Sequence, residues 1–156
     1  MNIEEFKKAL EPYSKKRSML FSPCPVDTKQ LTTVESAAEA YFGPEMQAFL
    51  TNMGYLGYDL FETTGINAAL PIEQSDLVKE SRMLHQHFPS TVGMAEIAYS
   101  EEYGYFLVDE HDSVFQFDPE DDRLEDTGTK LFSFLLTMIE TSSEFASELE
   151  DESEKI

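Results

Sequence analysis

Three short runs of aromatic and β-branched residues constrain the fold of this chain more than any other stretch. They cover residues 95–99, 103–108 and 113–117, and polar residues separate them. Pro119, in the polar segment after the third run, has no N–H to donate to a further ladder hydrogen bond. Polar connections this short join antiparallel neighbours. The sequence therefore predicts an antiparallel β-meander.

Alternation along a strand divides the residues of the predicted sheet between two faces. In the middle run, Phe106 and Val108 share one face. Tyr103, Tyr105 and Leu107 share the other. An apolar face has to be covered by helices, whereas a face with tyrosine hydroxyls can stay wet or meet a partner. We therefore expect helices on one face and treat the tyrosine face as either open or packed in the core.

Acidic residues outnumber basic residues and gather on the predicted sheet. The chain of 156 residues has 31 Asp and Glu against 11 Lys and Arg, a formal net charge of −20. Residues 96–126 hold twelve acids and one base, Arg123, whereas residues 1–30 hold four acids and six bases. Such a surface disfavours nucleic acid and anionic membranes and favours basic partners, although charge also serves solubility. Concentration on one element favours the partner interpretation.

Length and composition indicate one domain in a reducing compartment. With 41 % hydrophobic residues, the chain can bury a sizeable core. The single cysteine, Cys24, excludes an intramolecular disulfide. The first fifteen residues lack the apolar run of a signal peptide, and no stretch approaches the ~20 apolar residues of a membrane helix. We expect a cytoplasmic protein with one domain over residues 1–148 and an acidic, disordered tail over residues 149–156.

Four apolar stripes at helical spacing are expected to pack around the sheet. Asn2 can cap the first helix. Thr32 and Glu35 have the spacing of a capping box ahead of a helix over residues 34–41. Pro44 takes the first position of the next helix. The stripes are Ile3, Phe6, Leu10 and Tyr13; Met46, Phe49, Leu50 and Met53; Leu77, Ser81, Leu84 and Phe88; and Leu131, Phe134, Leu135, Met138 and Ile139.

The last of these stripes predicts a closing helix that packs on the sheet. Thr127 or Thr129 is expected to be its N-cap, and residues 123–127 are expected to add a short strand before it. Together the elements predict a single α+β domain, with helices packed around an antiparallel meander and a C-terminal helix that closes it.

Motifs of catalysis and metal binding are absent from the sequence. The acidic run after Pro119 resembles a calcium loop, but Arg123 stands where the loop requires Gly. His85 and His87, two apart on a helix, cannot chelate one ion. The many carboxylates are uninformative by themselves, because a general acid or base needs surroundings that shift its pKa. We therefore expect no catalytic residue, no metal ion, no cofactor and no enzymatic activity.

The sequence also resembles the SUKH superfamily. Residues 42–50, with Glu35 eight residues before Gly43, are similar to the signature helix pair of that family. In the family, a Glu is followed eight residues later by Leu-Pro, then by an aromatic and Phe-Leu. Here Gly43 follows Phe42 in place of Leu-Pro, and Met46 replaces the aromatic. The resemblance spans roughly residues 27–140 and includes the strands at 95–98, 105–109 and 113–117 and the helix at 131–139.

The resemblance implies a single α+β domain with helices around a curved antiparallel sheet. Many bacterial members of the superfamily are immunity proteins that bind and neutralise polymorphic toxins, often nucleases. Fungal relatives act as scaffolds in cell-wall signalling. The resemblance implies no catalytic residues.

Our leading hypothesis is a cytoplasmic immunity protein that binds a basic toxin domain, foremost a nuclease, as a monomer or weak homodimer. Carboxylates can occupy the positive surface that a nuclease presents to phosphate. Tyr103 and Tyr105 are the expected anchors, with core packing as the alternative for each. The expected charged surround, for which solvated turns are the alternative, consists of Glu96, Glu101, Glu102, Asp109, Glu110 and Asp112.

Two further hypotheses stay open. A regulatory scaffold of the fungal type would bind other proteins with no toxin involved, and the absence of a neighbouring toxin gene in many genomes would favour it. An enzyme or small-molecule binder would be favoured by a deep pocket that holds a carboxylate with a strongly raised pKa.

Overall fold

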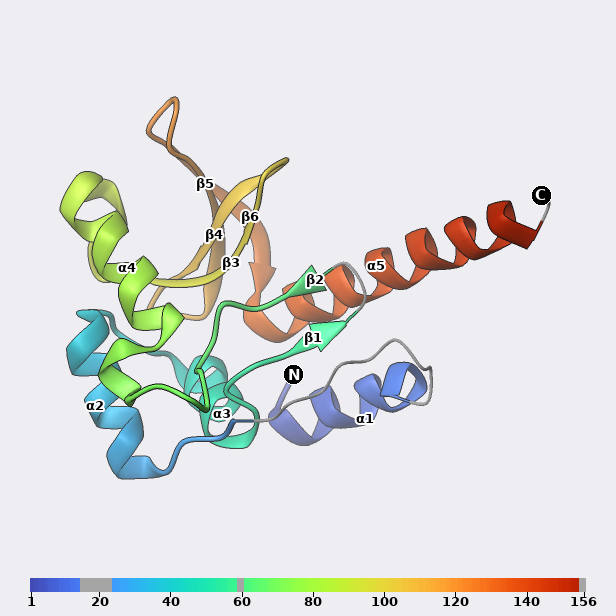
Figure 1. Ribbon diagram of the computed structural model, residues 1–156. Helices are drawn as coiled ribbons and strands as arrows, with labels where there is room; N and C mark the ends of the chain where they lie inside the picture. Colours follow the sequence, from blue (N-terminus) through green and yellow to red (C-terminus); the bar gives the residue numbers. More distant parts are fainter. Residues whose placement is uncertain (15–23, 59–60, 155–156) are drawn as a thin grey trace.

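A four-stranded antiparallel meander lies at the centre of the fold, as predicted. The computed structural model describes residues 1–14, 24–58 and 61–154, with side chains described up to residue 144. The fourth strand runs on to Lys130 rather than ending at residue 127. The strands follow one another across the sheet in chain order and are β3 (Ala95–Ser100), β4 (Gly104–Val108), β5 (Ser113–Asp118) and β6 (Arg123–Lys130) (Figure 1).

One face of this sheet packs on the closing helix, α5 (Leu131–Glu154). Phe106, Val108 and Val114 are buried on this face. The rings of Phe106 and Phe134 lie 4.8 Å apart, which joins the middle strand to the first turns of the helix. The predicted packing of a closing helix on the sheet is therefore confirmed.

The tyrosine-bearing face is also covered in part. The register pairs Tyr105 with Phe117, which places both side chains on the face opposite Phe106. Helix α4 (Asp76–His87) lies over this face, and its Leu84 packs with Phe117 and Leu107 in a second, smaller core. The inner part of the tyrosine face is thus core, and only its outer part remains accessible.

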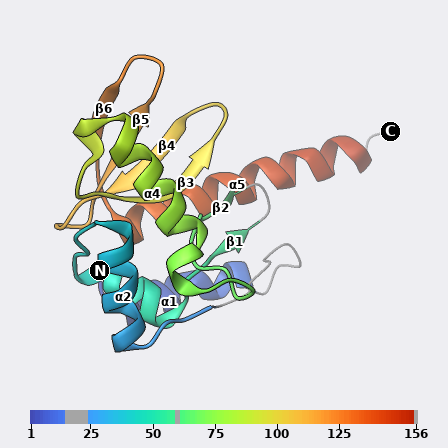
Figure 2. The same ribbon diagram turned by 60° about the vertical axis from the view of Figure 1, so that its left-hand side comes forward.

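The main core lies between the sheet and the remaining helices. In both views α1, α2 and α3 lie below the sheet, while α5 begins beneath it and runs outward past the short β1–β2 pair (Figures 1 and 2). Phe6 of the first helix stacks on Phe132 at 4.5 Å. The remaining elements are α1 (Ile3–Ser14), α2 (Thr28–Ala38), α3 (Pro44–Asn52), β1 (Gly57–Tyr58), β2 (Phe61–Glu62), and the 3₁₀ turns η1 (Ile72–Gln74) and η2 (Pro89–Thr91).

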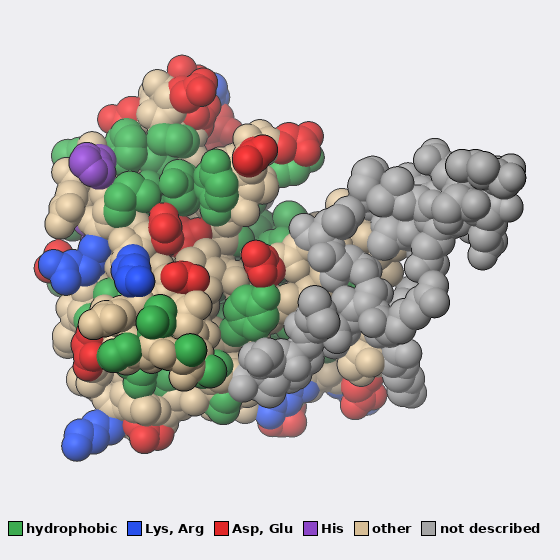
Figure 3. All heavy atoms as spheres, in the orientation of Figure 1, with side chains coloured by type: hydrophobic (Ala, Val, Ile, Leu, Met, Phe, Trp, Pro, Cys, Tyr) green, Lys and Arg blue, Asp and Glu red, His purple; other side chains and the backbone are tan. Residues whose placement is uncertain are grey.

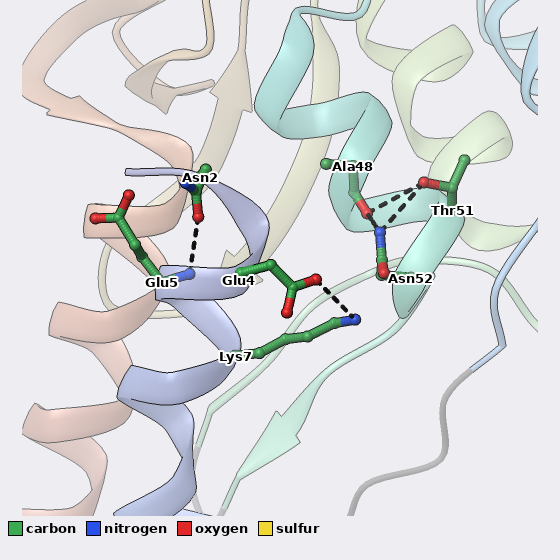
Figure 4. A network of polar contacts seen from close by, with 7 residues as sticks. All are labelled: Asn2, Glu4, Glu5, Lys7, Ala48, Thr51 and Asn52. Atoms are coloured by element: carbon green, nitrogen blue, oxygen red, sulfur yellow. Dashed lines mark hydrogen bonds and ion pairs between the residues drawn. The ribbon is translucent and has the colours of Figure 1, made fainter.

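The predicted cap of the first helix is confirmed. The Asn2 side-chain oxygen accepts from the backbone N–H of Glu5 at 2.9 Å, and Lys7 lies 3.8 Å from Glu4 one turn along (Figure 4). On the neighbouring α3, the Asn52 amide donates to the carbonyl of Ala48 near the C-terminal end. The Asn2 side chain thus satisfies a backbone N–H at a helix start that lacks an intrahelical partner.

The predicted start of the second helix is wrong. Helix α2 begins at Thr28, because Asp27 accepts from the Gln30 N–H at 2.7 Å while the Gln30 side chain accepts from the Asp27 N–H at 2.9 Å. This reciprocal capping box lies one turn before the expected one. Glu35 instead accepts from the N–H of Phe42 at 2.9 Å, which ties the helix to the loop before α3.

The predicted N-cap of the closing helix is also wrong. Thr127 and Thr129 lie within β6, which leads into α5 without a loop. The first turn is satisfied by distant groups instead, because the Glu45 carboxylate accepts from the Phe132 N–H at 2.8 Å. The helix continues through Glu154, whereas the sequence suggested loss of order from residue 149.

The elements form a single α+β domain, as the sequence predicts. Among the described helices, none has the length and apolar content needed to cross a membrane.

Candidate functional site

The predicted partner-binding residues lie at opposite ends of the sheet. Glu101, Glu102 and Tyr103 occupy the β3–β4 turn and are exposed. Asp109 and Glu110 occupy the β4–β5 turn, at the other end of β4. The structure therefore separates these residues and does not support a single surface made of both groups.

Asp112 is an interior residue and not part of a charged surround. It is 4 % exposed, and its two carboxylate oxygens accept from the N–H groups of Glu45 and Met46 at 2.9 and 3.0 Å. It therefore caps α3 from across the fold. Gly43 permits this approach, because a Cβ there would lie 2.6 Å from an Asp112 oxygen. The expectation of a surface role for Asp112 is wrong.

Asp109 shapes its turn, whereas Glu110 remains on the surface. The Asp109 side chain accepts from the N–H groups of His111 and Ser113, both at 2.9 Å. Glu110 is exposed and lies 3.6 Å from the His111 ring. Only Glu110 in this turn therefore presents a solvent-facing carboxylate of the kind expected.

Two acidic turns share the opposite end of the sheet. Because strand direction alternates in a meander, the β5–β6 turn lies at the same end as the β3–β4 turn, and both tips point the same way (Figures 1 and 2). The exposed acids of these two turns, which we call the acidic end, are Glu101, Glu102, Glu120, Asp121 and Asp122. The sequence pattern did not combine these two groups.

A cleft of about 770 Å³ opens between α4, the free edge of β3 and the segment that follows β2. The backbone N–H of Thr64 donates to the Ile97 carbonyl at 2.9 Å and attaches this segment to the sheet edge. Asn67 accepts from the Asp76 N–H at 2.7 Å and fixes the start of α4. The cleft is lined by Tyr55, Glu62, Thr63, Thr64, Asn67, Asp76, Glu80, Glu96, Tyr99 and Tyr105.

Glu96 is the most unusual group in this cleft. It is completely shielded from solvent, and neither carboxylate oxygen has a hydrogen-bond partner among the described residues. Its backbone N–H donates to the Ser81 hydroxyl of α4 at 2.9 Å, so the residue itself is held firmly. The expectation of an exposed, charged Glu96 is wrong.

Burial raises the pKa of Glu96 to about 8, and the nearby carboxylates of Glu80 and Asp76 add to the rise. The Thr64 side chain opposes this rise without meeting the geometry of a hydrogen bond. At neutral pH the carboxyl is therefore largely protonated, and it would ionise if a cation came to lie beside it.

A pair of tyrosines forms one wall of the cleft. Tyr99 and Tyr105 oppose each other in the β3–β4 register, and their rings lie 4.7 Å apart at 45°. Tyr99 is 55 % exposed, whereas Tyr105 is half-buried. Burial, and then the carboxylate of Glu80, raises the pKa of Tyr105. The pair therefore offers aromatic surface at the mouth of an acidic site.

The charge of the cleft has one sign. The Tyr55 hydroxyl donates to Glu62 at 2.7 Å, and burial followed by this contact raises the pKa of Tyr55 to about 12. Four carboxyl groups and three tyrosines line the cleft, and none of its described lining residues is Lys, Arg or His. Figure 3 shows acidic side chains interspersed with hydrophobic ones on this face of the molecule, with Lys and Arg side chains beside them toward the left of the view. The arrangement can attract a cationic group and hold it against aromatic surface.

Most of the cleft was not predicted from the sequence. Glu96 and Tyr105 were predicted as partner-binding residues, whereas Tyr99, Glu80 and Asp76 were not. Tyr99 could have been found, because a short antiparallel turn places it opposite Tyr105. The acids of α4 carry no such signal, since only tertiary packing brings them to the sheet edge. Among the described residues, no group of three or more His, Cys, Asp and Glu is placed to hold a metal ion.

Comparison with known proteins leaves the chain unassigned. No family model matches it, and no curated protein does.

Proposed function

We propose that this chain is a non-enzymatic protein-binding module of the immunity type, which neutralises a basic toxin domain, foremost a nuclease. The observation that carries the proposal is the acidic cleft with its tyrosine wall, which lies next to the acidic end. Tyr99 links the two regions, because it lies in the cleft two residues before Glu101.

An immunity protein of this kind competes with nucleic acid for the positive charge of the nuclease. A nuclease presents Lys and Arg to the phosphates of its substrate. Carboxylates at the acidic end attract such a surface over several ångströms and raise the rate of encounter, while tyrosines supply stiff contact area after docking. Tyr103, 49 % exposed in the β3–β4 turn, stays the predicted anchor outside the cleft.

Co-expression with the product of a neighbouring gene tests this proposal. Where a gene directly beside this one encodes a basic domain that stops growth, this chain should restore growth and form a stoichiometric complex that inhibits the domain in vitro. The proposal fails if the domain stays active in the presence of excess protein, although both are folded.

A regulatory scaffold related to the fungal proteins is the first alternative. It would use the same acidic surface to bind a basic segment of another protein, with no toxin involved. Genomes that carry this gene without a toxin gene beside it would favour this alternative.

The cleft itself favours a second alternative, an enzyme or small-molecule binder. A carboxyl that stays protonated at neutral pH in a cleft of about 770 Å³ can act as a general acid. A defined metabolite that co-purifies with the protein at a stoichiometric level, and that Glu96→Gln loses, would favour this function over toxin binding.

A further inference from the structure

The interior of the cleft contains a buried carboxyl group, that of Glu96, which accepts no hydrogen bond from a described residue. Both oxygens of Glu96 are buried and unpartnered, although the large majority of buried side-chain polar atoms in proteins have a hydrogen-bond partner. Leaving a buried polar group unpaired destabilises a fold, because the group has lost its hydrogen bonds to water. A donor that entered the cleft would remove this penalty.

The surroundings select a positively charged donor. Asp76 and Glu80 lie close enough to Glu96 to oppose its ionisation. A neutral donor would leave that repulsion in place, whereas a cation would offset it. Charge complementarity therefore indicates that the ligand is a cation.

The shape and the aromatic wall select an extended, planar cation. A cavity of about 770 Å³ is far larger than one ion requires, and Tyr99 and Tyr105 present ring surface beside the carboxylates. A guanidinium is planar, stacks on aromatic rings, and offers five donors in a fork that matches a carboxylate. An ammonium is compact and strongly hydrated, so it would use the rings and both Glu96 oxygens less fully.

We propose that the cleft receives the guanidinium group of an arginine from a partner protein, with Glu96 as the inner acceptor and the Tyr99–Tyr105 pair as the stacking surface. Glu62, Asp76 and Glu80 flank the bound charge. This inference rests on the proposed function for the source of the arginine, a basic partner. Because Glu96 is shielded from solvent, lining side chains turn aside as the arginine enters, a change common on binding.

Blocked tripeptides provide the probe. N-acetyl-Gly-Arg-Gly-amide is titrated into the protein by NMR, in parallel with the lysine peptide and with the citrulline peptide, which has the same shape but no charge. We expect saturable binding of the arginine peptide with Kd of about 1 mM, with shifts at the Tyr99 and Tyr105 rings and the Glu96 carboxyl carbon. Compared with the arginine peptide, the lysine peptide should bind at least about 3-fold more weakly, and the citrulline peptide should bind at least about 10-fold more weakly.

Matched variants locate the site. Glu96→Gln and Tyr99→Ala should each weaken binding of the arginine peptide by about 10-fold or more. Glu110→Gln, an exposed carboxylate at the other end of β4, should leave it unchanged. Glu96→Gln replaces a carboxyl that is largely protonated at neutral pH with an amide of the same size, so the variant is expected to stay folded, and its amide spectrum checks this.

Four results would overturn the inference. They are no saturation up to about 50 mM, equal binding of the arginine and citrulline peptides, equal binding of the lysine peptide, and full affinity in Glu96→Gln. Displacement of the arginine peptide by equimolar Ca²⁺ would reassign the cleft to a metal and count against it equally.

The inference and the proposed function fail separately. If a neighbouring toxin domain binds tightly and Glu96→Gln does not weaken that complex, the arginine site is wrong while the immunity function stands. If the peptide binds as described but the domain is not inhibited, the cleft stands and the immunity function falls.

Discussion

Glu96 shows that the charge and the role of a carboxyl group depend on its surroundings in the fold. In the sequence it is one of twelve acids between residues 96 and 126, and it was expected to face solvent with the others. In the fold it shares the face of Leu107, its register partner, and α4 closes over it. A residue that appeared to supply surface charge is instead a buried acid with a pKa raised to about 8.

Replacing Glu96 should change how stability depends on pH. The pKa rises from a reference value of 4.5 to about 8 on folding, so between these values the folded state holds a proton that the unfolded state has lost. The contribution of this group to stability is therefore full below about pH 4.5 and is lost as pH rises through 8. In urea denaturation, the free energy of unfolding of Glu96→Gln should lack the part of the decline with pH that Glu96 causes. At pH 8.5 the free energy of unfolding of the variant should therefore be higher than that of the unmodified protein by several kcal/mol.

Glu110→Gln is the matched control for that measurement, because Glu110 is exposed. It should keep the pH dependence of the unmodified protein. The same decline from pH 5 to pH 8.5 in Glu96→Gln and in the unmodified protein would contradict a raised pKa at this site.

Asp112 caps the start of α3, so the fold should be sensitive to the removal of its carboxylate. Asp112→Ala removes both acceptors at the start of α3, and an N-cap loss costs about 1–2 kcal/mol. Asp112→Asn keeps one acceptor oxygen and tolerates the positive φ of 62°, so its loss should be smaller. The free energy of unfolding checks this order, and equal losses would show that the two hydrogen bonds contribute little.

At the scale of elements, the junction between the sheet and α5 holds the fold together. The strand β6 leads straight into α5, and the first turn of the helix is completed by Glu45 from α3. Burial, and then the nearby carboxylate of Asp112, raises the pKa of Glu45, while its bond to the Phe132 N–H lowers it. The closing helix is thus fixed by apolar packing and by groups distant in sequence.

Phe134 tests that packing. Phe134→Ala removes a ring that is 6 % exposed and lies against Phe106, so we expect a loss of about 3–5 kcal/mol in the free energy of unfolding. Ser133→Ala, at the exposed neighbouring position, should change stability by less than about 0.5 kcal/mol. A loss below about 1 kcal/mol in Phe134→Ala would mean that the helix does not pack as described.

At the scale of the whole molecule, charge is arranged by the direction of the strands. The meander brings two acidic turns to one end and leaves Glu110 at the other. The single charged surround predicted from the sequence is therefore replaced by an acidic end beside an acidic cleft. Steering of a basic partner should depend on where a charge lies and not only on the net charge.

Reversing charges at the two ends separates these contributions. Glu101→Lys combined with Glu102→Lys should slow association with a basic toxin domain by about 10-fold at low salt, and added salt should remove most of the difference. Glu110→Lys combined with Glu73→Lys changes the net charge equally, at exposed positions outside the acidic end, and should slow association much less. Equal slowing by both pairs in stopped-flow measurements would indicate an effect of net charge alone.

The sequence by itself determined most of the elements of this protein. The first three strands of the meander, the Asn2 cap and the Pro44 helix start were predicted because they depend on alternation, periodicity and local hydrogen bonds. Only the tertiary structure decided the caps that come from distant residues, the burial of Glu96 and Asp112, and the cleft at the edge of β3. These depend on contacts between residues far apart in the chain, and local patterns of charge and hydrophobicity do not encode which distant surfaces meet.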